Sequence, residues 1–163
     1  MTEIIASPAQ IFKANMLPTG YNVALVSFVE RYKSSDNRMT ALEEFLREYP
    51  ALINGKFYER QVSENGVDFY YPNESGDQYF NVLAWSRILD NMEYLCAINL
   101  NQISTATIHV TIDDKIHPIG SKLYCLHGTN ECPNELNVEV RNGKSIRLTI
   151  PAGEIVCYGA KSE

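Results

Sequence analysis

The chain has 163 residues, 45% of them hydrophobic, which is enough for one folded domain with a sizeable core. Its net charge of −6, and the lack of any cluster of four or more Lys or Arg residues, argue against binding to nucleic acid or to an anionic membrane. No charge-free apolar run reaches about 18 residues and the N-terminus has no secretory signal pattern, so we expect a cytoplasmic protein without membrane segments.

The first part of the sequence predicts helices. Ser7 and Pro8 suit the capping and first positions of a helix over residues 8–16. Residues 21–33 fit either a helix or a strand, and we favour a helix because apolar residues recur on one helical face. After a polar break, an amphipathic helix is predicted over residues 39–49, with apolar residues three and four positions apart: Met39, Leu42, Phe45, Leu46 and Tyr49, before Pro50 ends it.

The longest apolar stretch of the chain, residues 79–100, contains a clear reversal. It predicts two strands, residues 82–89 and 93–100, joined by a tight turn at Asp90 and Asn91, since both residue types tolerate left-handed backbone conformations. Apolar residues fall on both faces of these strands. We therefore expect the hairpin to be buried on both sides.

From Gly55 onward the sequence has the two-residue period of β-strands. In residues 104–112, apolar residues alternate strictly with threonine and His109, which predicts one core face and one solvent-exposed face that carries His109. Asn142 and Gly143 give the strongest signal for a hairpin turn. The other strands are predicted at residues 56–63 and 67–71, around a turn at residues 64–66, and at residues 122–126, 136–140, 145–150 and 154–158.

The predicted fold is mainly β, an antiparallel Greek-key β-sandwich of about eight strands preceded by two or three short helices. We assign residues 1–50 to an N-terminal helical segment that packs on the sandwich. Residues 51–163 are assigned to the sandwich domain.

The four cysteines could serve as disulfides, metal ligands or core residues. Cys96 and Cys157 lie in apolar strand patterns, and in the expected reducing compartment we interpret them as buried thiols. Cys125, His127 and Cys132 form the most ligand-like cluster, but the spacing C-x-H-x4-C lacks the C-x2-C pairs typical of zinc sites. We therefore expect four reduced cysteines, no metal and no cofactor.

Four segments follow one another in a characteristic order: residues 41–60 (ALEEFLREYPALINGKFYER), 82–101 (VLAWSRILDNMEYLCAINLN), 118–126 and 148–159 (LTIPAGEIVCYG). This series resembles the C-terminal end of alpha-amylase-family glycoside hydrolases. In that family, the last helix of the catalytic barrel leads into an antiparallel β-sandwich. The resemblance covers roughly residues 39–159, whereas residues 1–38 match no pattern of the family.

The resemblance implies an accessory domain that lacks the catalytic barrel. The family's chemistry needs two carboxylates about 5 Å apart at the ends of barrel strands, and the sequence contains none of the motifs that carry them. Asp113 and Asp114 fit a solvated turn instead, and no nucleophile elbow, Walker loop or dinucleotide fingerprint is present. We expect no enzymatic activity from this chain alone and a structural or interaction role in carbohydrate metabolism.

Two other functions stay open. A stand-alone α-glucan-binding module would use aromatic side chains that stack on sugar rings, and the candidate residues are Phe69, Tyr70, Tyr71, Asp77 and Tyr79. Ordinary strand packing is the alternative for these residues, and the mid-strand position of Trp85 predicts a core residue. The remaining function is a glycosidase with an unrecognised site.

The apolar stripe of the helix over residues 39–49 needs a cover when the barrel is absent. The expected partner is a catalytic barrel domain, a second copy of the chain, or the first 38 residues folded back as a helical cap. We favour the cap, whose apolar residues would be Ile11, Phe12, Leu25, Phe28 and Val29.

Overall fold

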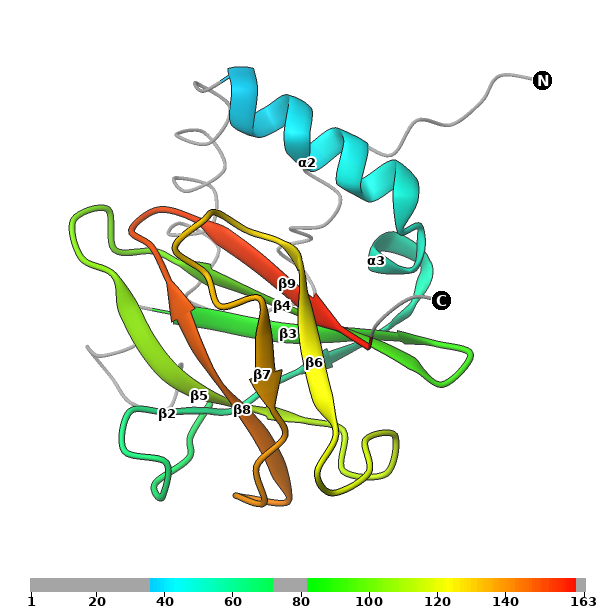
Figure 1. Cartoon of the computed structure of the whole chain (residues 1–163), viewed down its shortest axis with the longest axis vertical. Coiled ribbons are helices and arrows are strands. Elements are labelled where there is room, and N and C mark those ends of the chain that lie inside the picture. Colours follow the sequence, from blue (N-terminus) through cyan, green and yellow to red (C-terminus); the bar gives the residue numbers. More distant parts are fainter. Residues whose placement is uncertain (1–35, 72–81, 161–163) are drawn as a thin grey trace.

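The computed structural model describes residues 36–71 and 82–160 of the chain (Figure 1). Its two longest strands are β3 (Val82–Leu89) and β4 (Met92–Asn99), which pair antiparallel along their whole length. Asp90 and Asn91 between them have left-handed backbone, with φ angles of 53° and 61°, as a two-residue hairpin turn requires. The predicted central hairpin is confirmed.

Nine strands lie in the described ranges and form two antiparallel sheets (Figure 1). The strand order is β1-β3-β4-β9-β6-β7 in the large sheet and β2-β5-β8 in the small sheet. The predicted fold, a mainly β antiparallel sandwich with helices before it, is confirmed. The other strands are β1 (Lys56–Glu59), β2 (Val62–Ser63), β5 (Ala106–Ile112), β6 (Lys122–His127), β7 (Glu135–Asn137), β8 (Lys144–Ile150) and β9 (Ile155–Gly159).

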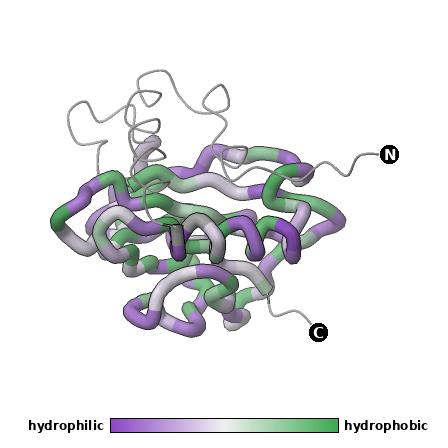
Figure 2. The backbone as a smooth tube through the Cα atoms, turned by 90° about the horizontal axis from the view of Figure 1, so that it is seen from above, coloured by the Kyte–Doolittle hydropathy of each residue, from purple (hydrophilic) through white to green (hydrophobic). Residues whose placement is uncertain are grey.

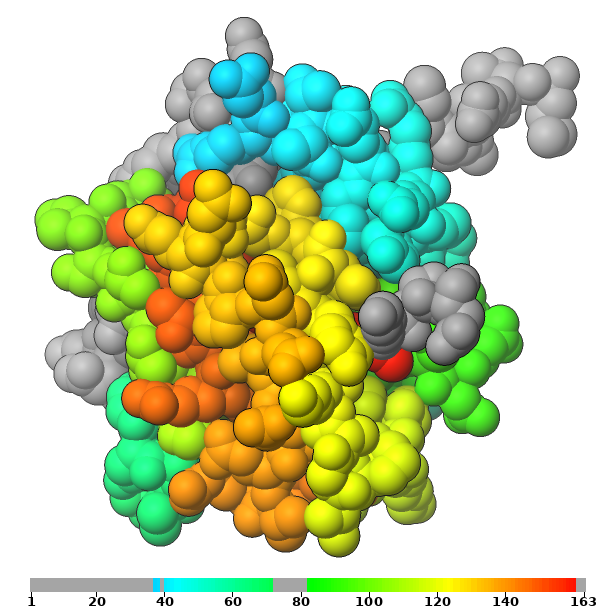
Figure 3. Space-filling view, in the orientation of Figure 1, coloured from blue at the N-terminus to red at the C-terminus, as the bar shows by residue number. Residues whose placement is uncertain are grey.

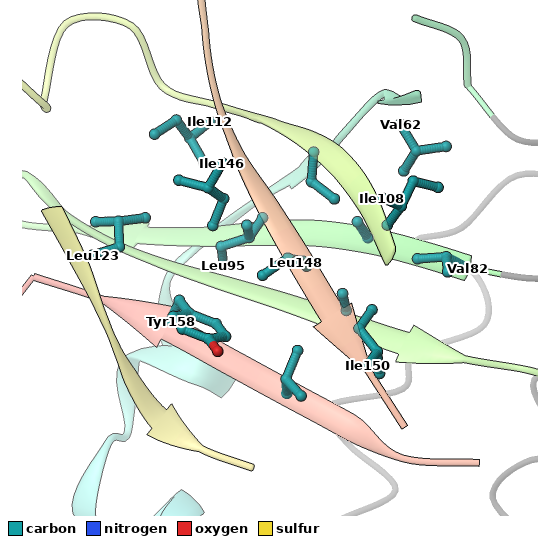
Figure 4. Close-up of a cluster of buried hydrophobic side chains, with 14 of the residues drawn as sticks. Val62, Val82, Leu95, Ile108, Ile112, Leu123, Ile146, Leu148, Ile150 and Tyr158 are labelled. Atoms are coloured by element: carbon teal, nitrogen blue, oxygen red, sulfur yellow. The ribbon is translucent and has the colours of Figure 1, made fainter. Parts of the chain in front are cut away.

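The main core lies between the two sheets. Alternate side chains of the large sheet point into it, among them Leu95 from β4 and Tyr158 from β9 (Figure 4). In β5 Ile108, Val110 and Ile112 are at most 4% exposed and Ala106 is partly buried against them, so its core face is confirmed. The small sheet contributes Val62, Ile108, Val110, Ile112, Ile146, Leu148 and Ile150.

The opposite face of the large sheet is covered by α2 (Asp36–Glu48) and the short α3 (Ala51–Asn54) (Figure 1). Trp85 lies in this second cluster and is 1% exposed, which confirms it as a core residue. In the space-filling view the helices, blue to cyan, form a continuous layer against the strands (Figure 3). The hairpin is therefore buried on both sides as predicted, by the small sheet on one face and by helices on the other.

The apolar stripe of α2 packs on the chain's own sheet. Leu42, Phe45 and Leu46 are at most 6% exposed and share a cluster with β3, β4 and β9. Along the backbone as a whole, hydrophobic and hydrophilic residues alternate in short stretches (Figure 2). The helical segment was predicted to pack on the sandwich, but the cover of this stripe was expected from residues 1–38, a second copy of the chain or a barrel. The helices predicted over residues 8–16 and 21–33 lie outside the described residues.

Pro50 ends α2 as predicted, but the chain then makes one more turn of helix. α3 starts directly after Pro50, and the N–H of Gly55 donates to the Ala51 carbonyl over 2.7 Å to close it. Neither helix in the described ranges has the length and apolar character needed to cross a membrane.

The strand predicted over residues 56–63 is divided. Its first half, β1, pairs with β3 in the large sheet, and its second half, β2, pairs with β5 in the small sheet. This strand therefore connects the two sheets at their edges. A uniform two-residue period cannot reveal the change of sheet, because both halves keep the same alternation.

Residues 67–71 do not form the predicted strand. Tyr70 makes a single bridge to Val62, and the turn before it is held by side chains instead of by strand pairing. The Asn65 carbonyl oxygen accepts from the N–H groups of Val67 and Asp68, each over 2.8 Å. Such side-chain acceptors compete with the ladder for backbone donors, so the segment stays a loop.

The exposure predicted for His109 is wrong, because this side chain is only 9% exposed. It lies on the outer face of the small sheet, as the alternation requires, but the loop after β2 folds over it. Gly66, with φ +78°, approaches so closely that a Cβ there would lie 3.0 Å from His109 Nε2. The cover comes from a loop, which strand periodicity does not report.

We predict that replacing Leu42 and Phe45 together by Ala lowers the free energy of unfolding by about 4–8 kcal/mol, because both are buried large side chains. Urea denaturation measures the change. Replacing the exposed Glu44 and Arg47 of the same helix by Ala is the matched control and should change stability by less than about 1 kcal/mol. Equal stability of the two double variants would contradict the packing of α2 on the sheet.

Candidate functional site

Glu93 is the most deeply buried carboxylate among the described residues, at 1% exposure. It lies in β4 opposite Ile88 of β3, at the end of the hairpin. Its side chain is on the same face as Leu95, which points into the core between the sheets. Burying a carboxylate costs several kcal/mol unless charges and hydrogen bonds compensate it. The groups around Glu93 therefore decide whether its carboxylate is charged and whether it stabilises the fold.

Four groups converge on the Glu93 carboxylate, and we call this set the Glu93 cluster. Arg60 Nη2 lies 2.9 Å from Oε2, and His117 Nε2 lies 2.7 Å from Oε1. The Ser86 hydroxyl donates to Oε2, and the Asp113 N–H donates to Oε1 over 3.0 Å. These groups come from β3, from the segment after β1 and from the loop between β5 and β6, so one carboxylate ties both sheets together.

The cluster keeps Glu93 ionised. Burial acts to raise the pKa of Glu93, but the hydrogen bond from His117, the positive charge of Arg60 and the hydrogen bonds from Ser86 and Asp113 outweigh it. The pKa of Glu93 therefore lies below its ordinary value. A general acid in a glycosidase needs the opposite, a carboxyl whose pKa is raised so that it carries a proton near neutral pH.

Asp113, the nearest second carboxylate, is also occupied by the fold. Its Oδ1 accepts from the N–H groups of Lys115 and Ile116, each over 2.8 Å, and so closes the turn after β5. Burial acts to raise the pKa of Asp113, and the two backbone hydrogen bonds more than offset it, so this pKa is lowered. Among the described residues, Glu93 and Asp113 together form a structural cluster and no acid/base pair.

The sequence analysis missed the Glu93 cluster. The only signal was a glutamate placed among apolar residues of a strand, with the pattern MEYLCAIN. Its partners Arg60 and His117 are 33 and 24 residues away along the chain. Both lie outside the strands, so only the folded structure shows that they meet Glu93.

The structure brings together only part of the predicted sugar platform. Phe69, Tyr70 and Tyr71 are partly buried, and Asp77 and Tyr79 lie outside the described residues. The Tyr70 hydroxyl donates to Glu64, and its ring packs against the core between the sheets. Burial and the neighbouring Glu64 raise the pKa of Tyr70. Sugar binding by this group stays a prediction.

The three residues of the ligand-like cluster do not converge on one point. The ring of His127 stacks on Phe45 of α2, with 4.8 Å between ring centroids. Cys125 and Cys132 instead lie with the core on the other side of the large sheet, because a β-bulge separates Cys125 from His127. Within the described residues, no three Cys, His, Asp or Glu side chains gather as a metal site would need. All four thiols are free.

We predict that Glu93→Gln lowers the free energy of unfolding by about 3–5 kcal/mol at pH 7, because it leaves the partly buried Arg60 without its charge partner. The matched control is Glu135→Gln, which removes an exposed, solvent-screened ion pair to Lys122 and should leave the urea midpoint nearly unchanged. Urea denaturation of both variants measures the difference. Equal midpoints for Glu93→Gln and wild type would refute the role of the cluster.

A second prediction concerns pH. Because the pKa of Glu93 is lowered in the fold, its stabilisation is fully present above the unfolded value of about 4.3 and is lost as the pH falls through the lower folded value. The wild type should therefore lose more stability between pH 5 and pH 3 than Glu93→Gln does. Parallel stability curves for the two proteins over this range would show that Glu93 does not titrate as proposed.

Comparison with solved structures gives matches to alpha-amylases and debranching enzymes. The alpha-amylase of Geobacillus thermoleovorans, solved with acarbose, matches with a TM-score of 0.50 and 12% identity over 78% of this chain and 23% of its own. The native debranching enzyme of Nostoc punctiforme matches with a TM-score of 0.49 and 22% identity over 76% of this chain and 21% of its own.

The chain spans about a fifth of the length of these enzymes. No protein-family model and no curated protein sequence matches it. At these identities the likeness establishes the fold. The chain therefore shares the fold of one part of the Geobacillus thermoleovorans alpha-amylase, in agreement with the sequence resemblance.

Proposed function

We propose that this chain is a non-catalytic accessory domain of an alpha-amylase-like glycoside hydrolase and that its role is structural, to pack on a catalytic barrel. The observation that supports this most directly is the fold match, which covers 78% of this chain but only 23% of the Geobacillus thermoleovorans amylase. A segment of that size corresponds to an accessory unit and not to a barrel of about 250 residues.

The charged groups of the described residues support the same role. The carboxylates with lowered pKa, Glu93 and Asp113, both serve the fold through ion pairs and backbone hydrogen bonds. A retaining glycosidase instead needs one carboxylate free to attack the sugar and one protonated partner about 5 Å away. In the proposed enzyme, the catalytic barrel supplies these two carboxylates.

α2 covers the outer face of the large sheet, and α3 leads directly into β1. In alpha-amylase-family enzymes the last helix of the barrel leads into the sandwich, and α2 lies in the segment of this chain that resembles it. We propose that the barrel contacts the sandwich on this side.

The first test measures catalysis. Purified protein incubated with a chromogenic maltoside should release no product above the blank, because the proposed domain has no catalytic pair. A measurable rate that is lost in an Asp→Asn or Glu→Gln variant would overturn the proposal and would favour a glycosidase with an unrecognised site.

The second test separates an accessory domain from a glycan-binding module. In affinity electrophoresis, the protein should migrate equally in gels with and without starch or glycogen. Retardation by glucan that disappears in Phe69→Ala or Tyr71→Ala would support the binding module instead. Val67→Ala, in the same loop and 74% exposed, is the matched control that should change nothing.

The third test measures whether this domain stabilises the proposed barrel. If a barrel is encoded together with this chain, expressing the two as one protein should raise the barrel's melting temperature above that of the barrel alone. An unchanged barrel melting temperature would contradict the structural role.

A further inference from the structure

Cys125 in β6 and Cys132 in the loop between β6 and β7 both place their sulfurs next to Gly128. A Cβ built on Gly128 would lie 3.1 Å from the sulfur of Cys125 and 3.0 Å from the sulfur of Cys132. Both sulfurs therefore lie close to the same point in space. A side chain at position 128 would press against both of them, so glycine leaves room for the two thiols there.

The loop is held in this shape by its own hydrogen bonds. The Cys125 N–H donates to the Asn134 carbonyl over 2.9 Å, and the Cys132 N–H donates to the Thr129 carbonyl over 3.0 Å. The Tyr158 hydroxyl donates to the Pro133 carbonyl over 2.6 Å and anchors the loop to β9. These hydrogen bonds hold the backbone that carries both cysteines.

The two thiols differ in access. Cys125 is partly exposed, whereas Cys132 is 5% exposed and its sulfur accepts a hydrogen bond from the Thr129 N–H over 3.4 Å. Exchange with a disulfide needs one cysteine that a reagent can approach and a second cysteine beside it. Burial raises the pKa of the Cys125 thiol, so only a small fraction of it is thiolate at neutral pH and the exchange is slow.

We propose that Cys125 and Cys132 form a redox-active dithiol that a low-molecular-weight disulfide, such as glutathione disulfide, oxidises to an intramolecular disulfide. The Cys125 thiolate attacks one sulfur of glutathione disulfide, forms a mixed disulfide and releases one glutathione. The Cys132 thiolate then attacks the Cys125 sulfur, forms the Cys125–Cys132 bond and releases the second glutathione. Two protein thiols are oxidised, and one glutathione disulfide is reduced to two thiols.

The other two cysteines provide an internal control. Cys96 and Cys157 are direct partners in the register of β4 and β9, so they are also neighbours. They are 0% and 1% exposed, under the helices. Glutathione cannot reach either of them in the folded protein. The two cysteines of each pair are thus neighbours, but of the four only Cys125 is partly exposed.

The experiment uses the full chain, reduced and then incubated with glutathione disulfide without denaturant. Remaining thiols are alkylated after unfolding, and the products are mapped by mass spectrometry. We expect two alkylated cysteines, Cys96 and Cys157, and a linked peptide that joins Cys125 to Cys132. Four alkylated cysteines, a link that involves Cys96 or Cys157, or a lasting glutathione adduct on the wild type would each overturn the proposal.

Variants separate the two steps. Cys132→Ser should stop at a stable glutathione adduct on Cys125, and Cys125→Ser should form neither adduct nor disulfide. Cys96→Ser should oxidise like the wild type. The oxidised wild type should also melt on the order of 5 °C higher than the reduced protein, reversibly with dithiothreitol, because the bond closes the loop in the unfolded chain. A stable Cys125 adduct that forms equally in wild type and Cys132→Ser would refute the resolving role of Cys132.

Discussion

The constraint on which this structure depends is a hairpin that is apolar on both faces. β3 and β4 carry buried side chains on each side of the large sheet, and water on either side would be unfavourable. The small sheet covers one face and α2 with α3 cover the other. The core under the helices uses side chains of α2 and α3, and the core between the sheets uses side chains of β5 and β8. The hairpin is therefore covered on both faces only when both the helices and the later strands are in place.

The Glu93 cluster holds the edge of the sandwich together, whereas apolar packing holds its centre together. A sandwich is weakest where the sheets separate and loops must close the gap, because backbone groups there have no ladder partner. Glu93 accepts hydrogen bonds from a strand hydroxyl, a loop N–H and a loop histidine, and pairs with the arginine that follows β1. A residue of this kind specifies how loop and strands meet, which apolar contacts alone do not fix.

The sequence predicted what depends on local pattern. The central hairpin, its left-handed turn, the helix before the sandwich and the core face of β5 all follow from residue types a few positions apart. It could not predict contacts set by register and by loops. The division of β1 from β2, the cover over His109 and the meeting of Glu93 with Arg60 and His117 depend on segments distant in the sequence.

The functional candidates also divide into one that local sequence pattern predicts and one that depends on contacts between distant segments. The resemblance to alpha-amylase-family enzymes came from ordered segments of sequence, and the fold match agrees with it. The pairing of Cys125 with Cys132 has no motif, because its geometry comes from a glycine between them and from a tyrosine on another strand. A bulge turns His127 to the opposite side of the sheet, so the three residues of the ligand-like cluster do not share one face. In this sandwich, one inserted residue in a strand decides which side chains face one another.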